Sequence, residues 1–99
     1  MNEQDVMTAL RQVIDPDIGI NIVDLGLVEA VRVEGEQVAV ALIMTTPACP
    51  QGEYLMDEAN RVLRKAGGGQ VRPVLTLLHS PLWSPERMSP EARKQMGWS

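Results

Sequence analysis

Apolar and polar residues follow two different periods along this 99-residue chain. A helical period begins after Asn2 and is ended by Asp15-Pro16, because the residue before a proline is pushed out of the helical region. A second helical period begins at Pro50 and reaches about Ala66. Between and after these helices, alternation of apolar and polar residues predicts three strands, over residues 27–34, 38–45 and 71–78.

The order of these elements predicts an α+β fold. The first two strands are joined by a short turn and form an antiparallel hairpin, whereas the helix between the second and third strands makes that pair parallel. The second strand is apolar on both faces and is expected at the centre of the sheet, and Pro73 places the third strand at an edge. Serine-proline-glutamate triplets at 84–86 and 89–91 add a short closing helix. The expected architecture is an α-β-β-α-β(-α) sandwich, with helices on a three-stranded mixed sheet, forming one domain over residues 1–99.

Composition narrows the classes of partner. The formal net charge is -4 and lysine and arginine form no cluster, which argues against a nucleic-acid-binding protein. No apolar run is long enough to span a membrane, and the first residues lack a signal-peptide core. A single cysteine excludes an intrachain disulfide. Together these features predict a cytoplasmic protein without a membrane partner.

Topology predicts where the residues capable of chemistry gather. The N-terminal end of the first strand and the C-terminal ends of the second and third strands are expected at one edge of the sheet, the usual place for ligands in open α/β sheets. Three segments meet there, residues 15–26, 45–52 and 79–83. This edge holds the only cysteine and the only histidine of the chain, and its candidate functional residues are Asp17, Asp24, Thr45, Thr46, Cys49, His79 and Trp83.

Cys49 is the member of this set best suited to reactive chemistry. It precedes Pro50 at the predicted start of a helix, where backbone N–H groups and the helix dipole favour a thiolate. The hydroxyls of Thr45 and Thr46 can donate hydrogen bonds to it. One thiolate cannot alone hold an iron–sulfur cluster or a structural zinc ion, which usually need about four ligands. If metal is bound, the other ligands come from His or Asp, from a second copy of the chain, or from a client protein.

Each candidate also has a plain structural interpretation. A lone cysteine is often a small buried apolar residue, and a lone histidine is a weak functional signal. Asp15–Asp17 is common turn chemistry, and Asp24–Gly26 is typical of a strand entry with a tight bend. Trp83 can serve as the packing anchor of the C-terminal residues. The pattern of residues alone leaves these alternatives open.

Three blocks of the sequence, "VIDPDIGINIVDLGLV", "MTTPACP" and "PLWSPERMSPEARKQMG", resemble the PaaD-like and SufT-like small proteins of iron–sulfur cluster assembly. The same domain occurs at the head of some Mrp-type cluster carriers. The blocks cover nearly the whole chain, and their order and spacing make the resemblance specific. It implies a fold similar to the C-terminal domain of NifU-type scaffolds. It also places the family's motifs on residues 15–17, 24–26, 45–50, 81–83 and 88–89, with Cys49 as the reactive cysteine.

The resemblance implies an accessory, non-enzymatic role in iron–sulfur cluster assembly or transfer. Cys49 would be a reactive thiolate or a transient ligand of iron or of a cluster, with no permanently bound cofactor. The partners would be iron–sulfur scaffold or carrier proteins and apo-protein clients, and a homodimer is one source of the missing ligands. The chain lacks the cysteine-rich tail of many PaaD-type members, which favours a SufT-like general role.

Two alternatives belong to other functional classes. The first is a docking module for an iron–sulfur carrier or a metal-enzyme maturation complex, including PaaD-like ring-oxygenase assembly, in which Cys49 is structural. The second is a small thiol enzyme with Cys49 as nucleophile and His79 as base, which needs the two side chains within hydrogen-bond reach.

Overall fold

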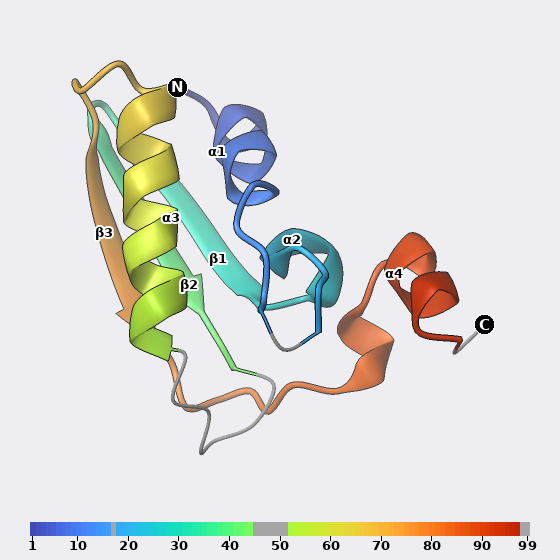
Figure 1. Ribbon diagram of the computed structural model, residues 1–99. Helices are drawn as coiled ribbons and strands as arrows, with labels where there is room; N and C mark the ends of the chain where they lie inside the picture. Colours follow the sequence, from blue (N-terminus) through green and yellow to red (C-terminus); the bar gives the residue numbers. More distant parts are fainter. Residues whose placement is uncertain (17, 45–51, 98–99) are drawn as a thin grey trace.

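The computed structural model describes residues 1–16, 18–44 and 52–97 (Figure 1). Its elements are, in chain order, α1 (Glu3–Leu10), α2 (Ile22–Leu25), β1 (Val28–Glu34), β2 (Gln37–Leu42), α3 (Gly52–Ala66), β3 (Arg72–Leu77), the 3₁₀ helix η1 (Pro85–Arg87) and α4 (Pro90–Gln95). The predicted α+β order is therefore confirmed, with one additional helix, α2, before the first strand.

The sheet has the predicted topology. Its strand order is β1-β2-β3, with β1 and β2 antiparallel and β2 and β3 parallel. Val40, at the centre, pairs with Val31 of β1 and with Leu75 of β3. Pro73 lies in β3, the edge strand that its missing N–H requires.

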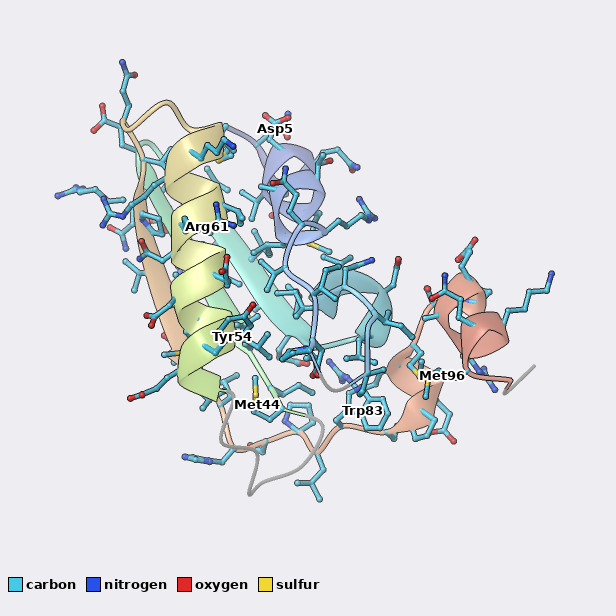
Figure 2. All side chains as sticks on the ribbon, viewed as in Figure 1. Asp5, Met44, Tyr54, Arg61, Trp83 and Met96 are labelled. Carbon is cyan, nitrogen blue, oxygen red and sulfur yellow. The ribbon has the colours of Figure 1, made fainter. Side chains whose placement is uncertain are left out.

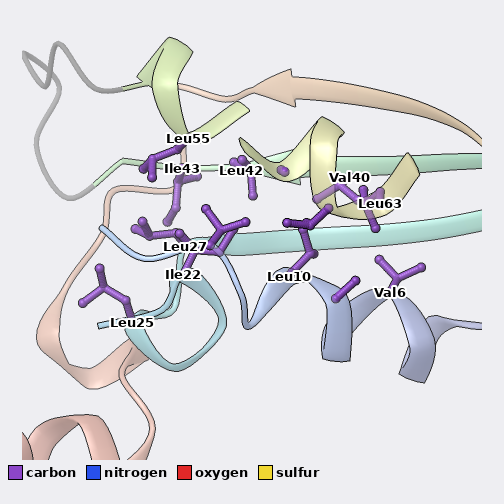
Figure 3. Packing of buried hydrophobic residues seen from close by; sticks show 14 of the residues in the cluster. Val6, Leu10, Ile22, Leu25, Leu27, Val40, Leu42, Ile43, Leu55 and Leu63 are labelled. Atoms are coloured by element: carbon purple, nitrogen blue, oxygen red, sulfur yellow. The ribbon is translucent and has the colours of Figure 1, made fainter. Parts of the chain in front are cut away.

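Helices α1 and α3 pack on one face of the sheet, and the core lies between these two layers (Figure 1). Figure 3 shows buried side chains from α1, α2, β2 and α3 gathered in one cluster. On the other face of the sheet, residues such as Arg32 and Val74 are exposed. Within the described residues, no helix is both long and apolar enough to cross a membrane.

Helix α1 ends earlier than predicted. It stops at Leu10 rather than continuing to Asp15. The backbone beyond it pairs with the segment that leads into α2, since the Ile22 N–H donates to the Val13 carbonyl at 2.9 Å and the Asp15 N–H donates to the Ile20 carbonyl at 3.0 Å. Val13 is buried and prolongs the apolar pattern, although it no longer lies in the helix.

The first turn of α1 is held by reciprocal hydrogen bonds. The Asn2 side chain accepts from the Asp5 N–H at 2.8 Å, and the Asp5 carboxylate accepts from the Asn2 N–H at 3.2 Å. Replacing Asn2 with alanine is expected to lower the free energy of unfolding by about 1 kcal/mol, because the Asp5 N–H at the helix end loses its side-chain acceptor. Urea unfolding measures this, with Gln4→Ala in the same exposed turn as the control. Equal losses in the two variants would contradict it.

Helix α2 was not predicted. Asn21 is its N-cap and accepts from the Asp24 N–H at 2.9 Å, and Gly26 ends it with a φ of 85°. An asparagine three residues before an aspartate, followed by a glycine, is a helix-cap signal in a segment too short for a periodic pattern. In α3, the apolar period of the sequence predicts burial of Leu55, Ala59, Val62 and Ala66. The first three are buried together with Leu63, whereas Ala66 is exposed.

The predicted helix starts near the C-terminus are confirmed. Ser84 precedes η1, and Ser89 is the N-cap of α4, where its hydroxyl accepts from the Ala92 N–H at 3.1 Å. A hydrogen bond from the Ser84 side chain lowers the pKa of the Glu86 carboxyl below its usual value, and a smaller contribution comes from the backbone N–H of Glu86. These local hydrogen bonds stabilise the helical turns of η1 and α4.

Candidate functional site

The three strand ends meet at one edge of the sheet, as predicted. The Ile43 N–H, just after β2, donates to the Leu27 carbonyl, just before β1, at 2.8 Å. The Leu78 N–H, just after β3, donates to the Leu42 carbonyl at 2.8 Å. We call this edge, where β1 begins and where β2 and β3 end, the site edge. Figure 1 shows it together with the N-terminal end of α3.

Both flanks of residues 45–51 lie at the site edge. Met44 follows β2, and Gly52 begins α3. A Cβ atom on Gly52 would lie 3.1 Å from Leu77 Cδ2 and 3.7 Å from Met44 Sδ, so the two flanks are close to the end of β3. The predicted site residues Thr45, Thr46 and Cys49, and also Asp17, lie outside the described residues, and their roles stay predictions.

Asp24 lies in α2, beside the start of β1. Its carboxylate accepts from Asn21 Nδ2 at 2.8 Å, and its own N–H donates to Asn21 Oδ1 at 2.9 Å. The side chain is half-buried. Gly26 adopts a φ of 85°, as the tight-bend interpretation of Asp24–Gly26 predicts. Asp24 therefore has a structural role in α2, and it lies at the site edge.

Trp83 anchors the segment that follows β3, which we call the tail (residues 79–97). Its indole Nε1–H donates to the Leu25 carbonyl at 2.6 Å. Figure 2 places Trp83 and Met44 along the same edge of the molecule. His79 begins the tail at the end of β3, and its side chain is exposed. Of the seven predicted site residues, the structure thus places Asp24, His79 and Trp83 next to the site edge.

Two charged residues at this end of the molecule were not selected from the sequence. Arg87 donates from Nε to the Gly26 carbonyl at 3.0 Å and pairs through Nη2 with Glu29 Oε2 at 2.5 Å. Asp15 is only 2% exposed, and its Oδ1 accepts from the Ile18 N–H at 3.3 Å. The contacts of Arg87 span about sixty positions and have no local signal. Asp15 belongs to residues 15–17, which the sequence analysis gave both as a turn and, from the resemblance, as a family motif.

No group of three or more His, Cys, Asp or Glu residues suited to a metal ion occurs in residues 1–16, 18–44 and 52–97. The site edge nevertheless brings together segments that are far apart in the sequence. They are the α2 turn, the flanks of residues 45–51 and the start of the tail.

Residues 3–75 match the family described as "Iron-sulfur cluster assembly protein". The chain belongs to this family. A relative named "Fe-S protein maturation auxiliary factor SufT", from Staphylococcus aureus, is 39% identical over 88% of this chain and 99% of its own length. This similarity supports the SufT-like part of the predicted resemblance. A "Fe-S protein maturation auxiliary factor" from Porphyromonas gingivalis is 33% identical over 97% of this chain and 91% of its own.

The fold of this iron–sulfur cluster assembly family member also has a solved counterpart. The crystal structure of a domain of unknown function, DUF59, from Bacillus anthracis superposes with a TM-score of 0.90 at 30% identity. The superposition covers 98% of this chain and 92% of that one. The similarity therefore includes the tail, although the family match itself ends at residue 75.

Proposed function

We propose that this protein is an accessory factor in iron–sulfur cluster assembly or in cluster transfer to apo-proteins. The observation that carries the proposal is the similarity over nearly the whole length of both chains to proteins named Fe-S protein maturation auxiliary factors. These names describe helpers of maturation, which supports a non-catalytic role. The proposed partners are iron–sulfur scaffold or carrier proteins and apo-protein clients in the cytoplasm.

In this proposal, Cys49 is a reactive thiolate or a transient ligand of iron or of a cluster. It precedes Gly52, the first residue of α3, by three positions. The free N–H groups at a helix N-terminus favour a thiolate over a thiol. Because one thiolate is an incomplete ligand set, the cargo is expected to be shared with a partner or a second copy and then released. Asp17, Thr45 and Thr46 are proposed to line the same site.

Anaerobic reconstitution with ferrous iron and sulfide tests this proposal. The wild-type protein is desalted, and its absorption spectrum and oligomeric size are recorded beside those of Cys49→Ser. We expect a sulfur-to-iron charge-transfer band in the wild type and its loss in the variant. A dimer that forms only with the cluster would identify the second copy as the source of the missing ligands. A wild-type protein without a band would contradict the ligand role of Cys49.

A second candidate function is a docking module in which Cys49 is structural. The tail supports it, because Leu82 is 72% exposed directly beside the anchored Trp83. An exposed aliphatic side chain gains free energy when a partner covers it and removes it from water. This candidate predicts that Cys49→Ser still stimulates maturation of a client apo-protein, whereas Leu82→Ala does not. The opposite pair of results favours the ligand role.

A further inference from the structure

Four consecutive carbonyl groups at the site edge accept hydrogen bonds from distant parts of the chain. These are the carbonyls of the turn from Asp24 to Leu27. The donors, in the order of the four carbonyls, are Ser89 N at 2.7 Å, Trp83 Nε1 at 2.6 Å, Arg87 Nε at 3.0 Å and Ile43 N at 2.8 Å. Three of these donors belong to the tail. The fourth is the first residue after β2, two positions before residues 45–51.

The turn from Asp24 to Leu27 therefore connects the tail to the end of β2. The carbonyls of residues 24–26 accept hydrogen bonds from the tail, and the next carbonyl, that of Leu27, accepts from the Ile43 N–H. The ion pair between Arg87 and Glu29 adds a contact from the tail to β1. Because backbone carbonyls removed from water need partners, the loss of the tail donors would leave this turn free to shift.

The tail backbone lies directly against this turn. A Cβ atom on Gly26 would be 2.4 Å from the Arg87 carbonyl oxygen and 2.7 Å from Arg87 Cβ. Met88 and Ala92 are buried in the core cluster. Figure 1 shows the tail running past the site edge to its own helix, α4, which contacts α2. The contact is thus a close packing of main chains as well as a set of hydrogen bonds.

We infer that the tail completes the site, and that Trp83 and Arg87 are positioning residues for it. They fix the turn from Asp24 to Leu27, and through the Leu27 carbonyl they fix the end of β2 relative to the carboxylate of Asp24. This inference rests on the proposed cluster-handling function and adds to it, because the family match ends at residue 75, before any tail donor. The tail lies outside the family match but inside the superposition on the DUF59 structure.

Arg87→Met tests the inference, because it keeps the aliphatic stem and removes both donors of the guanidinium group. We expect hydrogen exchange at the Ile43 amide to accelerate by about fivefold, since one supporting hydrogen bond and an ion pair are lost. The Leu78 amide, which donates to Leu42 and not to the turn, is the internal reference and is expected to keep its rate. Reconstitution with iron and sulfide is expected to give a weaker charge-transfer band than in the wild type.

Arg32→Met is the matched control, because Arg32 also pairs with a glutamate, Glu34, at 2.7 Å but lies away from the turn. It is expected to leave both amides and the band unchanged. Trp83→Phe is the second variant, since it keeps an aromatic ring and removes only the donor to the Leu25 carbonyl. It is expected to reproduce the selective effect at Ile43.

The outcomes separate this inference from the proposed function. Equal acceleration at Ile43 and Leu78 would indicate a general loss of stability and overturn the positioning role. Selective exchange at Ile43 with a band of wild-type intensity would also overturn it. A wild-type protein that forms no band would instead contradict Cys49 as a ligand, a result that needs no tail variant.

Discussion

Replacing Gly26 with alanine is expected to lower the free energy of unfolding by at least about 2 kcal/mol, and to displace the tail from α2. Gly26 adopts a φ of 85°, where a residue with a side chain costs about 1–3 kcal/mol. The added Cβ would also lie 2.4 Å from the carbonyl oxygen of Arg87. A backbone atom cannot rotate away as a flexible side chain would, so the tail or the turn must move.

Gly19→Ala is the matched control for this substitution. Gly19 has nearly the same φ, 82°, but a Cβ atom there would meet no atom within 4 Å. Gly19→Ala therefore measures the cost of the left-handed backbone alone, and the additional loss in Gly26→Ala measures the collision with the tail. Urea unfolding followed by tryptophan fluorescence gives both values. Equal losses would contradict the close packing between the tail and the turn.

The sheet and its site edge could be predicted because their signals are local. Alternation of apolar and polar residues marks the strands, and the lengths of the connections decide which pairs are antiparallel or parallel. Pro73 identifies the edge strand. Once these are known, the strand ends meet at one edge by topology alone. The observed bond between Ile43 and Leu27 confirms that convergence.

The remaining errors come from contacts that the local sequence does not encode. The apolar Val13 looks helical, but its carbonyl accepts from the Ile22 N–H rather than from the residue four positions later, as it would in a continued helix. Tertiary pairing thus overrides the helical period beyond Leu10. In the same way, the partners of Trp83 and Arg87 are 58 and 61 positions away. Sequence reasoning included Trp83 because it lies in the segment directly after the third strand. It missed Arg87 because this arginine lies beyond that segment and its residue type gives no signal.

The sequence therefore predicted which segments meet at the site edge, but not the hydrogen bonds that join them. Asp24 lies at the predicted edge, and its contact with Asn21 supports the structural interpretation that was weighed beside the functional one. The resemblance marked residues 81–83 and 88–89 of the tail, but the partners of the tail donors could not be predicted, since their hydrogen bonds use main-chain carbonyls as acceptors. Main-chain acceptors leave no signature in residue type. This is the physical reason that such a positioning role emerges only from the structure.

Leu63→Ala is expected to lower the free energy of unfolding by about 3 kcal/mol. Leu63 is fully buried in α3, and Figure 3 shows it near Val40 in the core. Deleting its branched end removes apolar contacts and leaves a cavity that the central strand and the helix cannot fill completely. The midpoint of urea unfolding is expected to fall while the slope of the transition stays constant.

The same substitution at an exposed leucine separates stability from function. Leu82, on the tail, is 72% exposed, and Leu82→Ala is expected to change the free energy of unfolding by less than about 0.5 kcal/mol. Comparable losses in the two variants would mean that the tail leucine is part of the core rather than of the surface. A Leu82→Ala protein of normal stability that fails to stimulate client maturation would instead assign this side chain to a partner interface. Because Leu63→Ala tests the core without touching the site edge, the pair distinguishes a weakened fold from a weakened interaction.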